Sequence, residues 1–332
     1  MPRPVEAPGW AGRAVLVTGV GGFLGGALAR LLAERGARVV GLLNPAGAHA
    51  RPDGMPGVEL AAADIRDPAA LAPLLARPGL HAVFHLAAQT LPTVARDNPA
   101  PAFELNARGT WNLLEAARRA PVPPRVVLAS TDSVYGENDG TPFTEDSPLG
   151  ASFPYEASKV CAETAARCYH VTYGLPVAIA RFCNLYGPGD VALIRLMAGT
   201  IVATLEGRRQ VLRGDGSSMR NYLYVDDAAE ALLTLAEALD RPGIAGQAFN
   251  FCDEAAHTVL EIVERVLTLA GRPDLAPALG RSTPGEISIK RASAAKAARV
   301  LGWHATTGLE EGLRRTIAWQ RHRMGLPAEA VA

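Results

Sequence analysis

AVLVTGVGGFLG, residues 14–25, is the stretch that decides the fold of this chain. Ala14–Thr18 is a short apolar run typical of a buried strand, and a helical pattern follows from Phe23 to Arg35. The turn between them carries glycines spaced GxxGxxG. Such a turn lets backbone amides approach a pyrophosphate at the positive end of the helix, although it could serve the fold alone. The candidate binding residues are Gly19, Gly22, Phe23, Leu24 and Gly25.

The same alternation of strand and helix patterns continues through the first half of the chain. The predicted strands are Ala14–Thr18, Arg38–Leu43, Val58–Ala62, Ala82–Leu86, Arg125–Ser130 and Val177–Arg181. The predicted helices are Phe23–Arg35, Ala69–Leu75, Ala102–Arg119 and Tyr155–Tyr173, with Gly36 and Gly174 as helix-ending glycines. This order predicts an α/β fold with a Rossmann-type doubly wound parallel sheet. We expect a dinucleotide-binding domain over residues 11–181. A smaller mixed α/β domain over 182–326 is expected mainly to bind substrate, with some segments returning to the first domain.

Composition narrows the class of protein. Lys plus Arg and Asp plus Glu each count 33, so no net charge favours nucleic acid or an anionic membrane as a partner. No apolar run is long enough for a membrane span, and no export signal is visible, so we expect a cytoplasmic protein. The cysteines have no zinc-type spacing, and we expect no metal and reduced thiols in or near the core. They are Cys161, Cys168, Cys183 and Cys252.

The end of the second strand indicates which dinucleotide binds. A carboxylate there would bond the ribose of NAD, and a nearby arginine would favour the phosphate of NADP. The sequence instead has Asn44, which can bond a hydroxyl, and the nearest base is Arg51 in a Pro/Gly loop. We therefore expect NAD.

Two further strand ends are candidates for lining the cofactor. Asp64 could accept from an adenine amino group and Ile65 could cover the ring, while Asp67 is better suited to cap the next helix. After the fourth strand, small residues would let the cofactor lie close to the backbone, and His85 is expected to be a packed strand residue. The residues in question are Leu86, Ala87, Ala88 and Gln89.

Tyr155 and Lys159 are four positions apart on a predicted helix, so their side chains share one face. A lysine one turn away can stabilise a phenolate, which makes tyrosine usable as a base near neutral pH. Thr131, at the end of the fifth strand, would orient the substrate oxygen, and Asp132 follows it. Without a catalytic role, Tyr155 and Lys159 would be an ordinary pair on the surface of a helix. Thr131 would then be a buried hydroxyl at the end of a strand.

These motifs together resemble the extended short-chain dehydrogenase/reductases and, within them, the NAD-dependent nucleotide-sugar epimerase/dehydratase family. The resemblance covers nearly the whole chain. It rests on the glycine turn and on stretches His85–Ala88, Asn106–Thr110, Ser130–Gly136, Tyr155–Lys159, Arg181–Gly189, Gly214–Gly216, Arg220–Asp227, Leu301–Trp303 and Leu309–Leu313.

The resemblance implies a reaction that begins at the C4 hydroxyl of a nucleotide-diphosphate sugar. Tyr155 would take its proton while hydride passes to NAD, giving a 4-keto sugar. It also implies that Asn106 joins the cofactor site and that helices Ala102–Arg119 and Tyr155–Tyr173 build a homodimer. Asn184 and Arg220 would hold the diphosphate. Lys290 and Arg291 are further candidates, although the ordinary place of such residues is a solvated surface.

Several reactions remain open within this resemblance. A 4,6-dehydratase carries an acidic Asp, matched by Asp132, followed by Glu or Lys, where this chain has Ser133. Because serine is a poor base, this favours a 4-epimerase, which needs only the tyrosine, lysine and threonine. Yet residues 111–115, 169–190 and 285–287 are most similar to CDP-glucose 4,6-dehydratases. Decarboxylation of a nucleotide-linked uronic acid, an NADPH-dependent reductase and a non-catalytic cofactor-binding regulator remain open as well.

Overall fold

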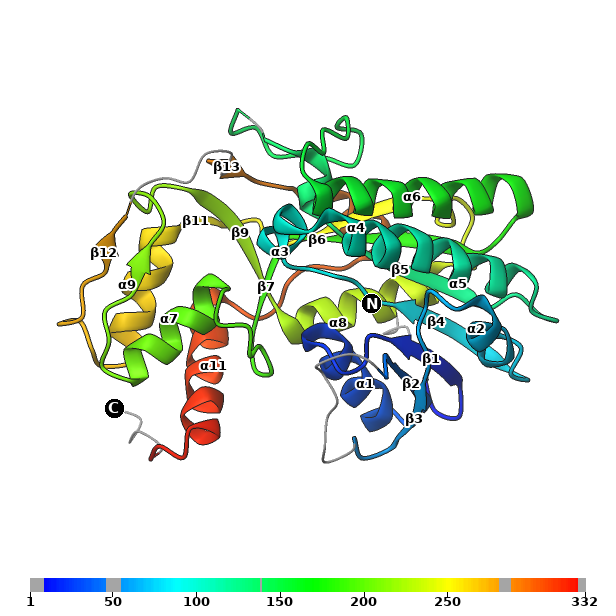
Figure 1. The fold of residues 1–332 in the computed structure, drawn as a ribbon, viewed down its shortest axis with the longest axis horizontal. Helices are drawn as coiled ribbons and strands as arrows, with labels where there is room; N and C mark the ends of the chain where they lie inside the picture. The colour runs from blue at the N-terminus through cyan, green and yellow to red at the C-terminus, as the bar shows by residue number, and fades with distance from the viewer. Residues whose placement is uncertain (1–8, 46–54, 138, 281–287, 328–332) are drawn as a thin grey trace, which may run out of the picture. The chain divides into compact units, whose positions relative to one another are not determined.

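The chain forms two compact units (Figure 1). The computed structural model describes residues 9–45, 55–137, 139–280 and 288–327. The first unit contains the residues up to Val134, then Ala151–Arg181 and Ala229–Phe249, and the second contains Tyr135–Gly150, Phe182–Ala228 and the residues from Asn250 on.

The first unit is built on a seven-stranded parallel sheet in the order β10-β6-β5-β4-β1-β2-β3. Its strands are β1 (Ala14–Thr18), β2 (Arg38–Leu43), β3 (Val58–Ala62), β4 (Leu80–His85), β5 (Arg125–Thr131), β6 (Val177–Phe182) and β10 (Ala248–Phe251). All six predicted strands are confirmed, with β4 beginning and ending slightly earlier than expected. Because β1 pairs in parallel with both β2 and β4, the chain reverses its direction of winding at β1. The sheet is therefore doubly wound, as predicted.

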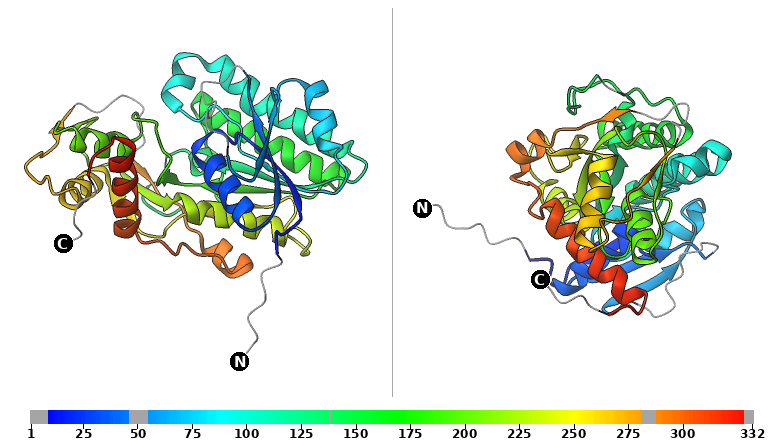
Figure 2. Two further views of the ribbon diagram at one scale, coloured as in Figure 1. Left: turned by 90° about the horizontal axis from the view of Figure 1, so that it is seen from below. Right: turned by 90° about the vertical axis from the view of Figure 1, so that its left-hand side faces the viewer.

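Helices cover both faces of this sheet (Figures 1 and 2). Helices α2 (Pro68–Leu75), α5 (Gly109–Arg118) and α6 (Pro154–Tyr173) pack side by side on one face. Helix α1 (Phe23–Glu34) packs on β1, β2 and β3, and an ion pair between Arg35 and Glu230 joins its end to α8 (Val225–Ala238). The apolar interior includes Leu16, Val83, Leu113, Val126 and Ile179, each at most 1% exposed. Burial of such side chains is the main stabilising contribution to the unit.

The predicted helix Ala102–Arg119 is wrong in one respect. Helix α3 (Pro92–Asp97) and α4 (Pro99–Ala102) precede a π-helical segment, Phe103–Arg108, and α5 begins only at Gly109. The wider π turn places Asn106 inward, where its side chain bonds two other segments. Apolar periodicity does not reveal such an insertion, and π segments in helices are frequent at functional sites.

The cysteine prediction holds for half of the residues. All four thiols are free, and Cys183 and Cys252 are buried, but Cys161 and Cys168 are exposed on α6. The buried face of α6 carries Ala162 and Ala166, and the two cysteines lie a heptad apart on a different face.

The second unit is a mixed α/β unit with a sheet centred on β9 (Met219–Tyr224). This strand pairs with β7 (Asn184–Tyr186), β11 (Ala256–Thr258) and β13 (Ile289–Lys290). Helices α7 (Leu196–Leu205), α9 (Val259–Leu269) and α11 (Leu309–Arg323) pack together against it, as Figures 1 and 2 show. The remaining elements are β8 (Val211–Leu212), β12 (Ala278–Leu279) and α10 (Ala295–Leu301). The core of the second unit includes Tyr186, Ile201, Tyr222, Ile262 and Leu313.

Two features are absent from the described ranges. No helix within them is long and apolar enough to cross a membrane. Likewise, the described residues contain no group of three or more His, Cys, Asp or Glu side chains that could hold a metal ion.

Candidate active site

The glycine turn at the end of β1 has no space for side chains. Gly19 has a φ of +72°, and a Cβ added there would lie 2.8 Å from the amide nitrogen of Ala87. A Cβ on Gly25 would overlap the carbonyl group of Gly19. Helix α1 begins after Gly22 with no side-chain cap and no acid in its first turn. Helix α1 therefore begins on a close backbone turn rather than on a capping side chain, the arrangement in which a helix N-terminus can receive an anion.

Thr18 ties this turn to the segment after β4. Its Oγ1 accepts hydrogen bonds from the amides of Leu86 and Ala87, both at 3.1 Å. Because both lone pairs are then used, Thr18 must donate its own proton to Nδ1 of His85, 2.8 Å away. The other ring nitrogen lies 3.1 Å from the hydroxyl of Thr110. His85 is thus a neutral, packed strand residue, as predicted, and burial lowers its pKa to about 3.

Asn106 joins the same segment to α6. Its Oδ1 accepts from the amide of Gln89 at 2.8 Å, and its Nδ2 donates to the Gln89 carbonyl at 3.0 Å and to Oγ of Ser158 at 2.9 Å. With 1% of its surface exposed, Asn106 has the contacts of a residue that positions the backbone after β4. The predicted residues from Leu86 to Gln89, including Ala88, therefore lie between the glycine turn and α6.

The residues predicted near the adenosine end lie in different surroundings. Asn44 is exposed immediately after β2. Asp64 is held by Arg66 at 2.5 Å, and this hydrogen bond lowers the pKa of the Asp64 carboxyl. Ile65 is 4% exposed and belongs to the core. Asp67 caps α2 as predicted, because its side chain accepts hydrogen bonds from the amides two and three residues further on.

The predicted acid/base pair lies on one helix. Tyr155 is in the first turn of α6 and 8% exposed. Lys159, 6% exposed, donates from Nζ to the carbonyl of Ala129 at 2.9 Å. Burial lowers the pKa of Lys159 to about 8, and the charge of Glu163 opposes that shift. The structure thus excludes a surface Tyr/Lys pair, because both side chains are buried.

Thr131 is the last residue of β5. Its hydroxyl donates to Oδ1 of Asp132 at 3.3 Å and accepts from the amide of Ser133 at 3.2 Å. A 3-10 turn, Asp132–Tyr135, follows directly. Thr131 and Ser133 are each 8% exposed and Asp132 is 1% exposed. Three consecutive polar side chains are therefore enclosed at the carboxyl end of β5.

The predicted diphosphate ligands belong to the second unit, on strands next to one another. Asn184 opens β7 opposite Tyr222 of β9, and Lys290 of β13 pairs with Arg220 of β9. Arg220 donates from Nη1 to the carbonyl of Ser288 at 3.0 Å. Contrary to the expected solvated position, Lys290 is only 6% exposed, because β13 packs against β9 and brings it inside. Arg291 follows Lys290 and donates to the Gly140 carbonyl at 3.4 Å.

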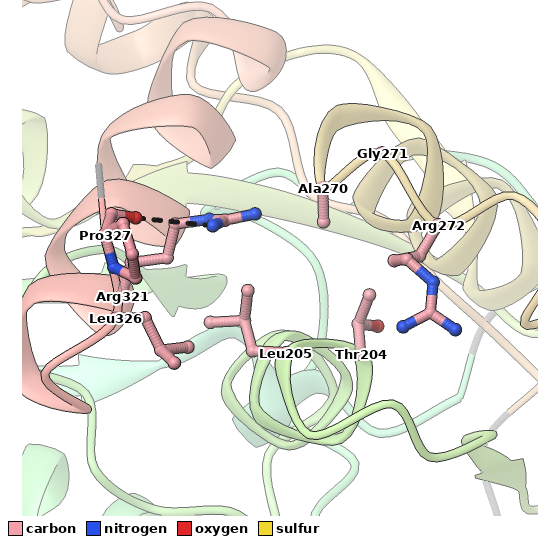
Figure 3. Close-up of a pocket in the computed structure, with 8 residues that line it drawn as sticks. All are labelled: Thr204, Leu205, Ala270, Gly271, Arg272, Arg321, Leu326 and Pro327. Carbon is pink, nitrogen blue, oxygen red and sulfur yellow. Dashed lines mark hydrogen bonds between the residues drawn. The ribbon is translucent and has the colours of Figure 1, made fainter. Parts of the chain in front are cut away.

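A separate cavity of about 240 Å³ lies in the second unit (Figure 3). It is lined by residues at the ends of α7, α9 and α11, among them two arginines, Arg272 and Arg321. Arg272 is bound to Asp274 at 2.8 Å, and Arg321 donates to the Pro327 carbonyl at 3.5 Å. No residue that the sequence singles out lines this cavity, so it is not the candidate site.

Sequence reasoning missed several residues that hold the site together. Thr18, Ser158, Ser130, Glu163 and Arg181 all bond buried groups next to predicted site residues. The i, i+4 spacing of Lys159 and Glu163 was one available signal. Arg51 and residues 285–287, which bear on cofactor choice and on the branch of the family, lie outside the described residues.

The sequence of the chain is similar to a family model and to proteins of known activity. Residues 15–252 match the model of the NAD dependent epimerase/dehydratase family. A UDP-glucose 4-epimerase of Mycolicibacterium smegmatis is 32% identical, over 93% of this chain and 98% of its own length.

Solved structures include both reaction types. The dTDP-glucose 4,6-dehydratase DesIV of Streptomyces venezuelae, with NAD bound, superposes with a TM-score of 0.84 at 32% identity, covering 94% of this chain and 98% of its own. The UDP-glucose 4-epimerase of Thermotoga maritima, with UDP-glucose, gives 0.87 at 26% identity, over 94% and 99%. The likeness therefore extends over whole chains but does not separate epimerase from dehydratase.

Proposed function

The chain belongs to the NAD-dependent epimerase/dehydratase family, and we propose that it is a nucleotide-sugar 4-epimerase acting through a 4-keto intermediate. It is an NAD-dependent enzyme of nucleotide-sugar epimerase or dehydratase chemistry. The observation that favours epimerisation is the sequence after β5, where Ser133 follows Asp132.

We propose that the first unit binds NAD and the second binds most of the sugar nucleotide. The amides of the turn from Gly19 to Gly25 would receive the pyrophosphate. Asn44 and Asp64 would face the adenosine, and the segment Leu86–Gln89 would line the nicotinamide half. When bound, NAD supplies a reversible hydride acceptor for C4 of the sugar.

Tyr155 would remove the proton of the C4 hydroxyl. Its phenolate is favoured by the ammonium of Lys159 one turn away and by the positive end of α6, whose first turn contains the tyrosine. Thr131 would hold the same substrate oxygen by a hydrogen bond. To invert C4 after the sugar has turned over, the hydride would have to return to the opposite face of the keto carbon, while Tyr155 would give its proton back to the C4 oxygen.

Dehydration needs more catalytic groups than Tyr155, Lys159 and Thr131. After C4 is oxidised, a base must remove the C5 proton while an acid protonates the leaving C6 hydroxyl. Asp132 could serve as that acid, and its presence beside Thr131 is what favours a 4,6-dehydratase as the second candidate. Ser133 has a hydroxyl where a Glu or Lys would be required, and a hydroxyl is a poor base without an activating partner. The epimerase proposal needs none of these additional groups.

The sugar nucleotide would be held through its diphosphate. Arg220 and Lys290 are neighbours in register on β9 and β13, and Asn184 lies on the other strand that pairs with β9. Two cations and an amide from adjacent strands suit a diphosphate in a chain whose net charge is zero. Arg291 would add a further charge beside them.

We also propose a cytoplasmic homodimer. Apolar side chains are exposed along the π-helical segment and helices α5 and α6: Phe103 at 38%, Trp111 at 46%, Val171 at 82% and Tyr173 at 55%. Exposed apolar side chains on neighbouring helices are what an association surface would cover. Four free thiols suit a reducing compartment.

The deciding experiment incubates the purified protein with UDP-, CDP-, dTDP- and GDP-sugars, without added reductant. Products are identified by mass spectrometry coupled to chromatography, with Tyr155→Phe as the inactive control. Unchanged mass with a new retention time supports 4-epimerisation. Loss of water would instead establish the dehydratase and refute the epimerase proposal.

A further inference from the structure

A buried ion pair lies one helical turn beyond Lys159. Glu163 on α6 and Arg181 at the end of β6 have side-chain exposures of 1% and 0%. Arg181 donates from Nη2 to Oε2 of Glu163 at 2.6 Å and from Nε to Oε1 at 3.0 Å. Two nitrogens of one guanidinium thus bind both oxygens of one carboxylate, a geometry that fixes the carboxylate in place.

The same carboxylate is bound to β5, beside the catalytic threonine. Ser130 donates from Oγ to Oε1 of Glu163 at 2.6 Å. Ala129, the preceding residue, accepts the hydrogen bond from Lys159 at 2.9 Å. Two side chains one turn apart on α6 therefore bind two consecutive residues of β5, and Thr131 is the next residue along that strand. The network therefore holds Lys159 beside the strand that ends at Thr131.

The charges around Lys159 explain why a carboxylate is needed there. Burial disfavours an ammonium, and the pKa of Lys159 falls to about 8, while Glu163 acts to raise it. From β4, His85 faces Lys159 as a neutral ring. Other buried ionisable groups on these elements are Arg181 of β6, Tyr155 and Glu156 of α6, and Asp132 directly after β5. Without Glu163, two buried cations, Lys159 and Arg181, would remain on adjacent elements.

We propose that Glu163 is a positioning residue for the catalytic pair: fixed by Arg181 and Ser130, it aligns Lys159 with β5 and keeps its ammonium charged. The charge relation rests on the i, i+4 spacing of Lys159 and Glu163 on α6 and on their bonds to consecutive residues of β5. Its importance for turnover rests on the proposed function, in which charged Lys159 stabilises the Tyr155 phenolate.

The sequence allows a direct test, because it contains only three lysines, Lys159, Lys290 and Lys296. Protein labelled with ¹³C at lysine Cε therefore gives three resonances, and the one missing from Lys159→Met is that of Lys159. Titration of this resonance measures the pKa of Lys159 without any substrate.

We expect Glu163→Gln to lower the measured pKa of Lys159 by at least about one unit, the usual effect of removing a close opposite charge. Arg181→Gln should leave this pKa at or above the wild-type value. Glu311→Gln, which breaks an exposed ion pair with Arg315, is the matched control and should leave it unchanged. An unaltered Lys159 pKa in folded Glu163→Gln protein would overturn the proposal.

Glu163→Gln leaves Arg181 buried without its carboxylate and can prevent folding. The double variant Glu163→Gln/Arg181→Gln removes both charges and is compared with Arg181→Gln alone. The proposal requires a lower Lys159 pKa in the double variant, and equal values would refute it.

Turnover supplies a separate readout. If the proposed reaction is observed, the alkaline limb of its pH profile should move to lower pH in Glu163→Gln, by the same interval as the Lys159 pKa. A purely structural role would reduce turnover and leave the limb in place. A wild-type protein inactive on every sugar nucleotide would refute the proposed function, while the lysine titration would still decide the role of Glu163.

Discussion

Replacing Gly25 by alanine should disturb the glycine turn at the end of β1 more than the addition of one methyl group suggests. A Cβ at this position would overlap the Gly19 carbonyl oxygen and would lie 2.8 Å from the carbonyl carbon and 3.0 Å from Cα of Val20. These atoms are backbone. The turn cannot retreat freely either, because Gly19 packs on Ala87.

The magnitude follows from two opposing effects. Within a helix, alanine is favoured over glycine by up to about 1 kcal/mol. Forcing an extra carbon into a filled site costs about 1–3 kcal/mol, and a backbone neighbour puts Gly25 at or beyond the upper end. We expect Gly25→Ala to lower the free energy of unfolding by about 2 kcal/mol. Displaced amides should weaken NAD binding at least about tenfold, the loss of one hydrogen bond to a charged group.

Urea denaturation and calorimetric titration with NAD measure the two effects. Gly22→Ala should be intermediate, since its Cβ would lie 3.2 Å from the Gly19 carbonyl oxygen. Gly9→Ala is the neutral control, because nothing lies within 4 Å of its Cβ position. Unfolding free energy and NAD affinity both within about 0.5 kcal/mol of wild type in Gly25→Ala would refute the reasoning.

Three other outcomes are expected. Tyr155→Phe should reduce turnover by about 10²–10⁴-fold or more while NAD affinity, measured by titration, stays near wild type, because only the proton-transfer hydroxyl is lost; substantial turnover would remove Tyr155 from its proposed role. The free energy of unfolding should fall as the pH drops from about 6.5 towards 4. Burial and two arginines lower the pKa of His81 to about 4, and burial lowers the pKa of His85 to about 3. In this pH range the unfolded chain therefore takes up protons that the folded chain does not. In urea melts across this window, His85→Asn should lessen the slope by about one proton, or about 1.4 kcal/mol per pH unit, and an unchanged slope would contradict the assignment. Thr258→Ala breaks the capping box with Glu261 that begins α9 and should cost about 1 kcal/mol, with faster hydrogen exchange in the first turn of that helix; Thr164→Ala, at an exposed position inside α6, is its control.

The choice between epimerase and dehydratase depends on very few atoms. The two reactions share the first step, and similar proteins of both kinds align with this chain over nearly its whole length. Overall similarity tracks the fold and the step that both reactions share, whereas in the proposed assignment Asp132 and Ser133 would bear on the later chemistry at C5 and C6. An analysis of the reaction product is therefore more informative than further similarity to known epimerases or dehydratases.

Local chemistry determined much of this protein. Strand and helix periods, helix-ending glycines and the spacing of Gly19, Gly22 and Gly25 act over a few residues, so the sequence alone predicted six strands of the sheet and the position of the glycine turn between β1 and α1. The i, i+4 relation of Tyr155 and Lys159 also follows from helix geometry.

Tertiary structure decided what depends on distant neighbours. The π turn at Asn106 accommodates partners on two other segments, and the burial of Lys290 results from its strand packing beside β9. Glu163 and Arg181 belong to elements brought together only by the sheet, so neither period nor turn chemistry pairs them. Local rules act through bonds and helical turns, whereas the charge state of a buried lysine depends on which groups folding places beside it.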